Sequence, residues 1–133
     1  MTKYAFAYVA TLVSFVLIDL VWLMWVARST YVAEMGTLLR KEPQLPAAIA
    51  FYLLYAAGLV FFAVVPGLKS GSALQALFLG AALGLVAYGT YDLTNLSVVE
   101  GFNLRIALID LLWGTFLSGI AAALVVAVTP KSL

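Results

Sequence analysis

Residues 73–96 read ALQALFLGAALGLVAYGTYDLTNL, an apolar run that ends in the most polar part of any long apolar stretch of the chain. The run is long enough for a helix to cross the hydrocarbon core of a bilayer, which is roughly 30 Å thick. Ala76, Gly80 and Gly84 recur every fourth residue, and the same stripe continues to Tyr88 and Asp92. Small residues at this spacing let a neighbouring helix approach closely. We therefore expect Asp92 to point into a helical bundle and not toward lipid, where a carboxylate is rarely tolerated.

The composition places the whole chain among membrane proteins. Of its 133 residues, 65% are hydrophobic and only 10% are charged, which is far from the balance of soluble domains. The net charge of +1 gives no sign of a nucleic-acid partner. The chain contains no Cys and no His, which excludes disulfides, thiolate nucleophiles, the usual zinc sites and His-ligated haem. We expect no metal site, and the composition identifies no cofactor.

Four apolar runs predict an all-α, four-helix membrane bundle that forms a single transmembrane domain over residues 1–133. The first run carries Asp19, and no small-residue cleavage pattern follows it, so we interpret it as a retained helix rather than a signal peptide. Pro66-Gly67 ends the second run, and the tight turn that follows makes the second and third helices an antiparallel hairpin. The predicted helices cover residues 4–27, 46–65, 73–96 and 105–128.

The first connection, residues 29–45, predicts a short amphipathic helix at the membrane interface. In it Val32, Met35, Leu38 and Leu39 recur at helical spacing. An ordinary polar loop with one helical turn is the alternative.

A hexapeptide occurs twice in the chain. Residues 17–22 read LIDLVW and residues 108–113 read LIDLLW, which differ at one position in six. Tyr52-x-x-Tyr55 and Tyr88-x-x-Tyr91 form a second, weaker repeat. The repeat indicates either an internal pseudo-symmetry of the kind found in small membrane transporters, or the recurrence of Trp anchors near a headgroup region.

The polar side chains of all four predicted helices fall at one depth. Counting about 1.5 Å per residue along each helix puts them in the half of the bilayer away from the termini. Three carboxylates cannot all be charged in a dry pocket, so one or more should hold a proton. Such a layer suits a ligand or proton site, and the alternative is a polar clamp that only joins the helices. The candidate ligand- or proton-binding residues are Asp19, Asp92, Asp110, Tyr88, Tyr91, Asn95, Trp22, Trp113, Tyr52 and Tyr55.

The motif Tyr-Asp-Leu-Thr-Asn-Leu at 91–96, with Asp110-x-x-Trp113-Gly114 and an Asp in the first helix, resembles the DUF2177 family of small predicted bacterial membrane proteins. The resemblance covers essentially the whole chain. It implies a four-helix membrane class and assigns no catalytic roles. With it we expect a multi-pass protein of the bacterial cytoplasmic (inner) membrane.

Three functions remain open at this point. The first is binding or transport of a small amphipathic or cationic molecule, by a single chain or a homo-oligomer, with proton exchange on an Asp driving release. Aromatic rings beside carboxylates suit a cation. The second is a membrane-embedded enzyme acting on a lipid or isoprenoid, for which no nucleophile–base pair is evident. The third is a structural partner without a ligand. The expected partners are the lipid bilayer and a small amphipathic ligand or lipid.

Overall fold

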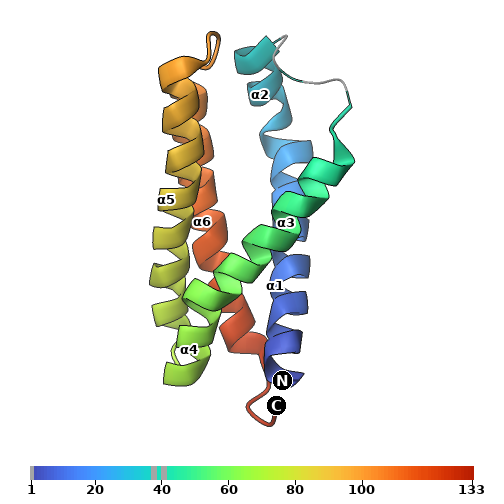
Figure 1. The fold of residues 1–133 in the computed structure, drawn as a ribbon, viewed down its shortest axis with the longest axis vertical. Coiled ribbons are helices and arrows are strands. Elements are labelled where there is room, and N and C mark those ends of the chain that lie inside the picture. Colours follow the sequence, from blue (N-terminus) through green and yellow to red (C-terminus); the bar gives the residue numbers. More distant parts are fainter. Residues whose placement is uncertain (1, 37–38, 40–41) are drawn as a thin grey trace.

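The computed structural model of the chain describes residues 2–36, 39 and 42–133. These residues form helices and turns, with no strand among them. Both ends of the chain lie at the same end of the bundle, and the other end, which we call the distal end, holds the short helix of the first connection (Figure 1). The predicted all-α membrane bundle is confirmed, and the chain is a multi-pass membrane protein. The helices long and apolar enough to cross a membrane are Thr2–Trp25, Leu45–Ser70, Ala73–Val98 and Leu104–Val128.

The first span leads directly into the short helix predicted for the first connection. Helix α1 covers Thr2–Val21, a wider π-helical turn covers Trp22–Val26, and α2 covers Arg28–Met35. The π-turn is closed by the Ala27 amide, which donates to the Trp22 carbonyl at 2.7 Å. Helix α2 then continues toward the distal end, roughly along the direction of α1 (Figure 1).

The packed side of α2 differs from the predicted one. Tyr31 and Met35 pack against a small cluster around Ile106 at the start of the fourth span. Val32, which we expected on the apolar face, is exposed. Leu38 lies outside the described residues.

The second span is longer than predicted. It consists of α3 (Leu45–Leu59), a π-helical turn (Val60–Val64) and α4 (Val65–Ser70), so helical structure continues past Pro66. Pro66 lies in the first turn of α4, where its missing N–H and fixed φ are tolerated. Gly71, with φ of +69°, ends the helix in the left-handed conformation that glycine adopts without strain.

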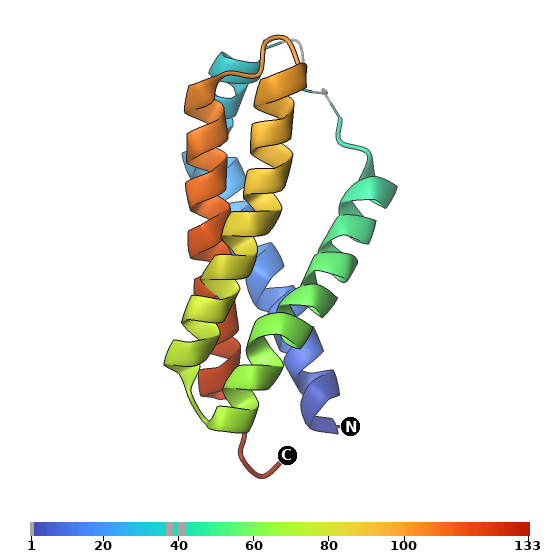
Figure 2. The same cartoon turned by 60° about the vertical axis from the view of Figure 1, so that its left-hand side comes forward.

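Helices α5 (Ala73–Val98) and α6 (Leu104–Val128) form the closest pair in the bundle. Each begins with a side-chain cap, because Ser72 accepts from the Gln75 amide and Asn103 accepts from the Ile106 amide, both at 3.0 Å. The two helices run side by side along their length, whereas the beginning of α3 leans away from them (Figures 1 and 2).

The small residues of α5 explain this close approach. Ala76, Gly80, Gly84 and Asp92 are all buried, so the predicted stripe does face the bundle interior. A Cβ atom at Gly80 would lie 2.6 Å from the Ser118 carbonyl oxygen, so a larger residue would push the two backbones apart.

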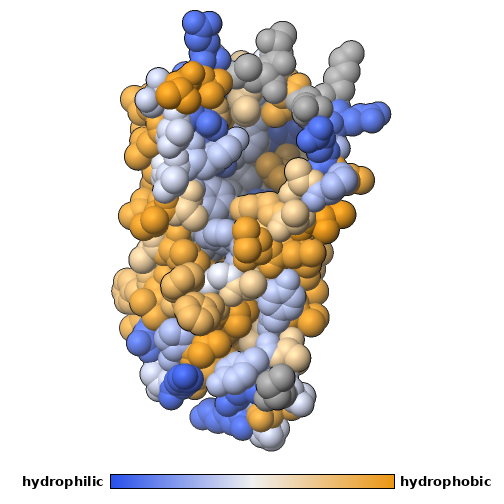
Figure 3. Space-filling view, viewed as in Figure 1, coloured by the Kyte–Doolittle hydropathy of each residue, from blue (hydrophilic) through white to orange (hydrophobic). Residues whose placement is uncertain are grey.

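The apolar core fills the half of the bundle nearest the termini. Its members come from the start of α1 and α5 and from the ends of the second and fourth spans, and include Phe15, Leu59, Ala76, Leu117 and Val125. The exposed outer surface is also largely apolar, as the spans require (Figure 3). In the distal half, where the beginning of α3 leans away from α5 and α6, the bundle contains a cavity.

Candidate functional site

A cavity of about 490 Å³ lies in the distal half of the bundle. The space-filling view shows the surface hollowed there, between the α5–α6 pair and the side formed by α2 and α3 (Figure 3). Every membrane span and α2 contribute to the lining. The lining residues are Asp19, Leu23, Tyr31, Phe51, Tyr55, Ala87, Tyr88, Tyr91, Asp110 and Trp113.

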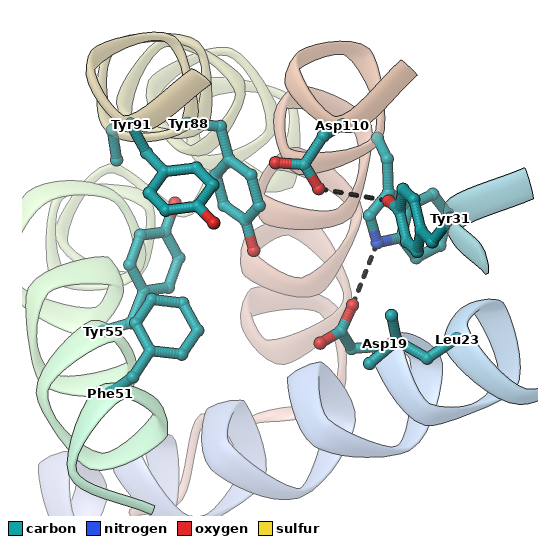
Figure 4. Close-up of a pocket in the computed structure, with 10 residues that line it drawn as sticks. Asp19, Leu23, Tyr31, Phe51, Tyr55, Tyr88, Tyr91 and Asp110 are labelled. Carbon is teal, nitrogen blue, oxygen red and sulfur yellow. Dashed lines mark hydrogen bonds between the residues drawn. The ribbon is translucent and has the colours of Figure 1, made fainter. Parts of the chain in front are cut away.

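The cavity has two chemically different walls (Figure 4). Phe51 and Tyr55 from α3 and Tyr88 and Tyr91 from α5 form one side, which we call the aromatic wall. Asp19 from α1 and Asp110 from α6 lie opposite, with Tyr31 of α2 beside them, and we call the two aspartates with this tyrosine the acidic wall. No Lys or Arg lines the cavity among the described residues.

Asp19 is held by hydrogen bonds on both carboxylate oxygens. The Tyr52 hydroxyl donates to Oδ2 at 2.6 Å, and the Trp113 indole nitrogen donates to Oδ1 at 3.0 Å. The carboxylate is buried, and the two donors offset the loss of water around it. Asp19 is therefore held in place as a hydrogen-bond acceptor in the wall of the cavity.

Asp110 accepts a hydrogen bond from Tyr31, which itself accepts one from Trp22. The Trp22 indole nitrogen donates to the Tyr31 hydroxyl at 3.1 Å, and that hydroxyl donates to Asp110 Oδ1, also at 3.1 Å. Burial raises the pKa of Tyr31 above its usual value, so the phenol remains a neutral donor.

The two copies of the repeated hexapeptide meet at this wall. The rings of Trp22 and Trp113 stack with centroids 4.2 Å apart and planes 7° apart. Each Trp is linked to the Asp of the other copy: Trp113 bonds Asp19 directly, and Trp22 reaches Asp110 through Tyr31. The repeat in the sequence thus corresponds to two segments that are in contact.

Asp92 lies behind the acidic wall. It is 0% exposed, does not line the cavity, and neither of its oxygens meets a hydrogen-bond donor among the described residues. The register of α5 on α6 places Asp110 opposite it: Gly84 packs on Ser118 and Tyr88 on Gly114, so Asp92, one turn further along α5, faces Asp110, one turn earlier in α6.

Six of the ten predicted site residues line the cavity: Asp19, Asp110, Tyr55, Tyr88, Tyr91 and Trp113. Three of the others contact lining residues, since Tyr52 bonds Asp19, Trp22 stacks on Trp113, and Asp92 faces Asp110. Asn95 is half-buried and lies outside the lining.

Four lining residues were not among the predicted ones: Leu23, Tyr31, Phe51 and Ala87. Tyr31 matters most, because it bridges Trp22 to Asp110. Its position four residues before Met35 was the available signal, since both residues lie on one face of a helix.

The chemistry of the site is that of an acidic, aromatic-lined chamber. No three acidic side chains among the described residues converge closely enough to hold a metal ion. The nearest described ion pair, between Arg105 and Glu34 at 3.6 Å, lies on the distal surface and not in the lining. Glu34 also accepts from the Asn103 amide at 2.6 Å, which joins α2 to the start of α6.

Comparison with known proteins gives the family. No curated protein and no solved structure matches the chain. A family model described as a predicted membrane protein matches residues 4–127, which is nearly the whole chain and includes both copies of the repeat and the 91–96 motif. The chain therefore belongs to the DUF2177 family of predicted membrane proteins.

Proposed function

We propose that the protein binds a small amphipathic cation in the distal cavity, as a binding or transport protein of the bacterial cytoplasmic membrane. The observation that carries this proposal is the division of one cavity into an acidic wall and an aromatic wall (Figure 4). Its volume of about 490 Å³ is within the range of small-molecule sites, which is roughly 300–1,000 Å³.

The charge of the lining favours a cation over an anion or a neutral lipid. Asp19 and Asp110 both line the cavity, no basic side chain lies opposite them among the described residues, and the surrounding helices are apolar. A cation is attracted strongly in such a site because little water screens the carboxylates.

The aromatic wall favours a cation that also carries apolar groups. Rings of Tyr and Phe attract a cation at their faces, by about 0.5–2 kcal/mol depending on how much water is excluded. They also cover apolar substituents, and Tyr91, which is 57% exposed, extends this wall to the outer surface of the bundle.

The alternative of a lipid-modifying enzyme has less support. Three tyrosine hydroxyls near the site are already bonded: Tyr31 to Asp110, Tyr52 to Asp19, and Tyr55 to Ser118 at 2.6 Å. Bonded in this way, they are less available to donate a proton to a substrate. No observation favours a specific reaction.

The test uses two probes of the same shape and opposite charge. Tetraphenylphosphonium and tetraphenylborate are titrated into the detergent-purified protein, and binding is followed by equilibrium dialysis. We expect the cation to bind and the anion not to bind. Asp19→Asn and Asp110→Asn should each weaken cation binding by about tenfold or more, which corresponds to about 1.4 kcal/mol.

The matched control is Glu100→Gln, which removes the same charge from an exposed turn outside the cavity. This variant should bind the cation like the wild type. Equal binding of both probes, or equal effects of Asp19→Asn and Glu100→Gln, would overturn the proposal.

A further inference from the structure

Asp92 is a carboxyl group without a partner that could stabilise its charge. It is fully buried on the α5 face that packs against α6, and neither oxygen meets a donor among the described residues. A buried carboxylate without donors is so unfavourable that the group binds a proton instead.

Asp110 connects this buried group to the cavity. On one side Asp110 faces Asp92 across the contact between α5 and α6, and on the other it accepts from Tyr31 and lines the cavity. Two adjacent carboxyl groups do not both ionise readily, because the second charge is repelled by the first. Asp92 and Asp110 therefore form one proton-holding pair, of which only Asp110 is within reach of a ligand.

Asp19 has the opposite environment, although it belongs to the same wall. Both of its oxygens accept hydrogen bonds from neighbouring side chains, whereas neither oxygen of Asp92 does. The two acids that line the cavity therefore differ: Asp19 is held by two hydrogen-bond donors, and Asp110 is half of a pair of carboxyl groups that can gain or lose a proton.

We propose that the Asp92–Asp110 pair exchanges a proton for the bound cation, so that one proton leaves for each monovalent cation that enters. In the empty site each carboxyl group of the pair holds one proton. When a cation enters, the O–H bond of one carboxyl group breaks, its electron pair stays on the oxygen, the proton passes to water, and the pair becomes a monoanion that faces the cation. This inference rests on the proposed cation binding and adds its coupling to protons.

The groups around the pair support this assignment of the proton. The titratable groups among them are all carboxylic acids or phenols. No described Lys or Arg lines the cavity to supply a competing positive charge. The titratable groups that face the pair or its neighbours are Asp19 of α1, Tyr31 of α2, Tyr52 and Tyr55 of α3, and Tyr88 and Tyr91 of α5.

The experiment counts protons released when tetraphenylphosphonium binds to the wild-type protein in weakly buffered detergent solution with a pH indicator. We expect about one proton per bound cation, and an apparent affinity that rises about tenfold per pH unit while the pair is protonated. Infrared difference spectra should show loss of the carbonyl stretch of a protonated carboxyl group on binding.

Asp92→Asn is the deciding variant. The amide keeps the shape and can donate to Asp110, which then remains a carboxylate, so cation binding should become independent of pH and release no proton. Glu100→Gln, on the exposed turn, should behave like the wild type. If Asp92→Asn does not fold, the wild-type proton count and infrared signal still decide the question.

The outcomes separate the two proposals. Binding of the cation without proton release by the wild type, or unchanged proton release from Asp92→Asn, would overturn the exchange and leave cation binding intact. Absence of cation binding by the wild type would overturn both.

Discussion

Replacing Gly114 by Ala tests how the aromatic wall is held in place. The Tyr88 ring lies directly on Gly114 of α6, and a Cβ atom there would overlap Cγ, Cδ1 and Cδ2 of that ring. The ring has the α6 backbone on one side and the cavity on the other, so it can move only into the cavity. Overpacking of this kind costs about 1–3 kcal/mol. We therefore expect Gly114→Ala to destabilise the protein by about this amount and to weaken cation binding.

The assay is unfolding in mixed micelles, titrated with a denaturing detergent and followed by circular dichroism. Gly58→Ala is the matched control, because Gly58 is also helical but has nothing within 4 Å of the added Cβ atom. It should be neutral or stabilising by about 0.5–1 kcal/mol. A double-mutant cycle with Tyr88→Ala tests this contact. In the Tyr88→Ala background, where the ring is absent, Gly114→Ala should cost much less stability than in the wild type. Equal effects at 114 and 58, or no coupling between 114 and 88, would refute the reasoning.

Two further predictions concern the distal helix and the topology. Tyr31→Phe removes two hydrogen bonds, the one to Asp110 and the one from Trp22. At roughly 0.5–1.5 kcal/mol per lost bond, amide hydrogen exchange over residues 28–35 should become about 5- to 160-fold faster; unchanged exchange would mean that these bonds do not hold α2. The chain contains no native Cys, so Lys3→Cys and Lys131→Cys can be labelled selectively. A membrane-impermeant maleimide should reach both from the same side of the membrane, and labelling from opposite sides would contradict the four-span topology.

The sequence predicted those features that depend on periodicity within one helix. The stripe from Ala76 to Asp92 lies on a single helical face, and close packing on that face follows from its small residues. The depth of the polar layer likewise follows from counting residues along each span. Asp19 and Asp110 therefore could be expected to meet, and they line one cavity.

Features that depend on contacts between helices could not be predicted in the same way. Periodicity places Asp92 on the inner face of α5. Whether Asp92 lines the cavity depends on how α5 packs on α6, and in the structure Asp110 lines the cavity and Asp92 does not. The role of Tyr31 depends on α2 continuing from the π-turn alongside the start of α6, and no residue pattern marks that turn. Pro66 predicts a helix end because proline normally breaks a helix, but here it lies in the first turn of α4, where it is tolerated.

The most direct test of cation binding between the two walls is a crystal structure with tetraphenylarsonium, whose arsenic atom is located by its anomalous scattering. The proposed function predicts one arsenic site in the distal cavity, between Asp19 and Asp110 on one side and the rings of Tyr88 and Tyr55 on the other. An Asp19→Asn crystal grown under the same conditions should have a weaker arsenic peak at that site. Arsenic bound only on the outer surface, or an arsenic peak in the cavity that Asp19→Asn leaves unchanged, would contradict the account.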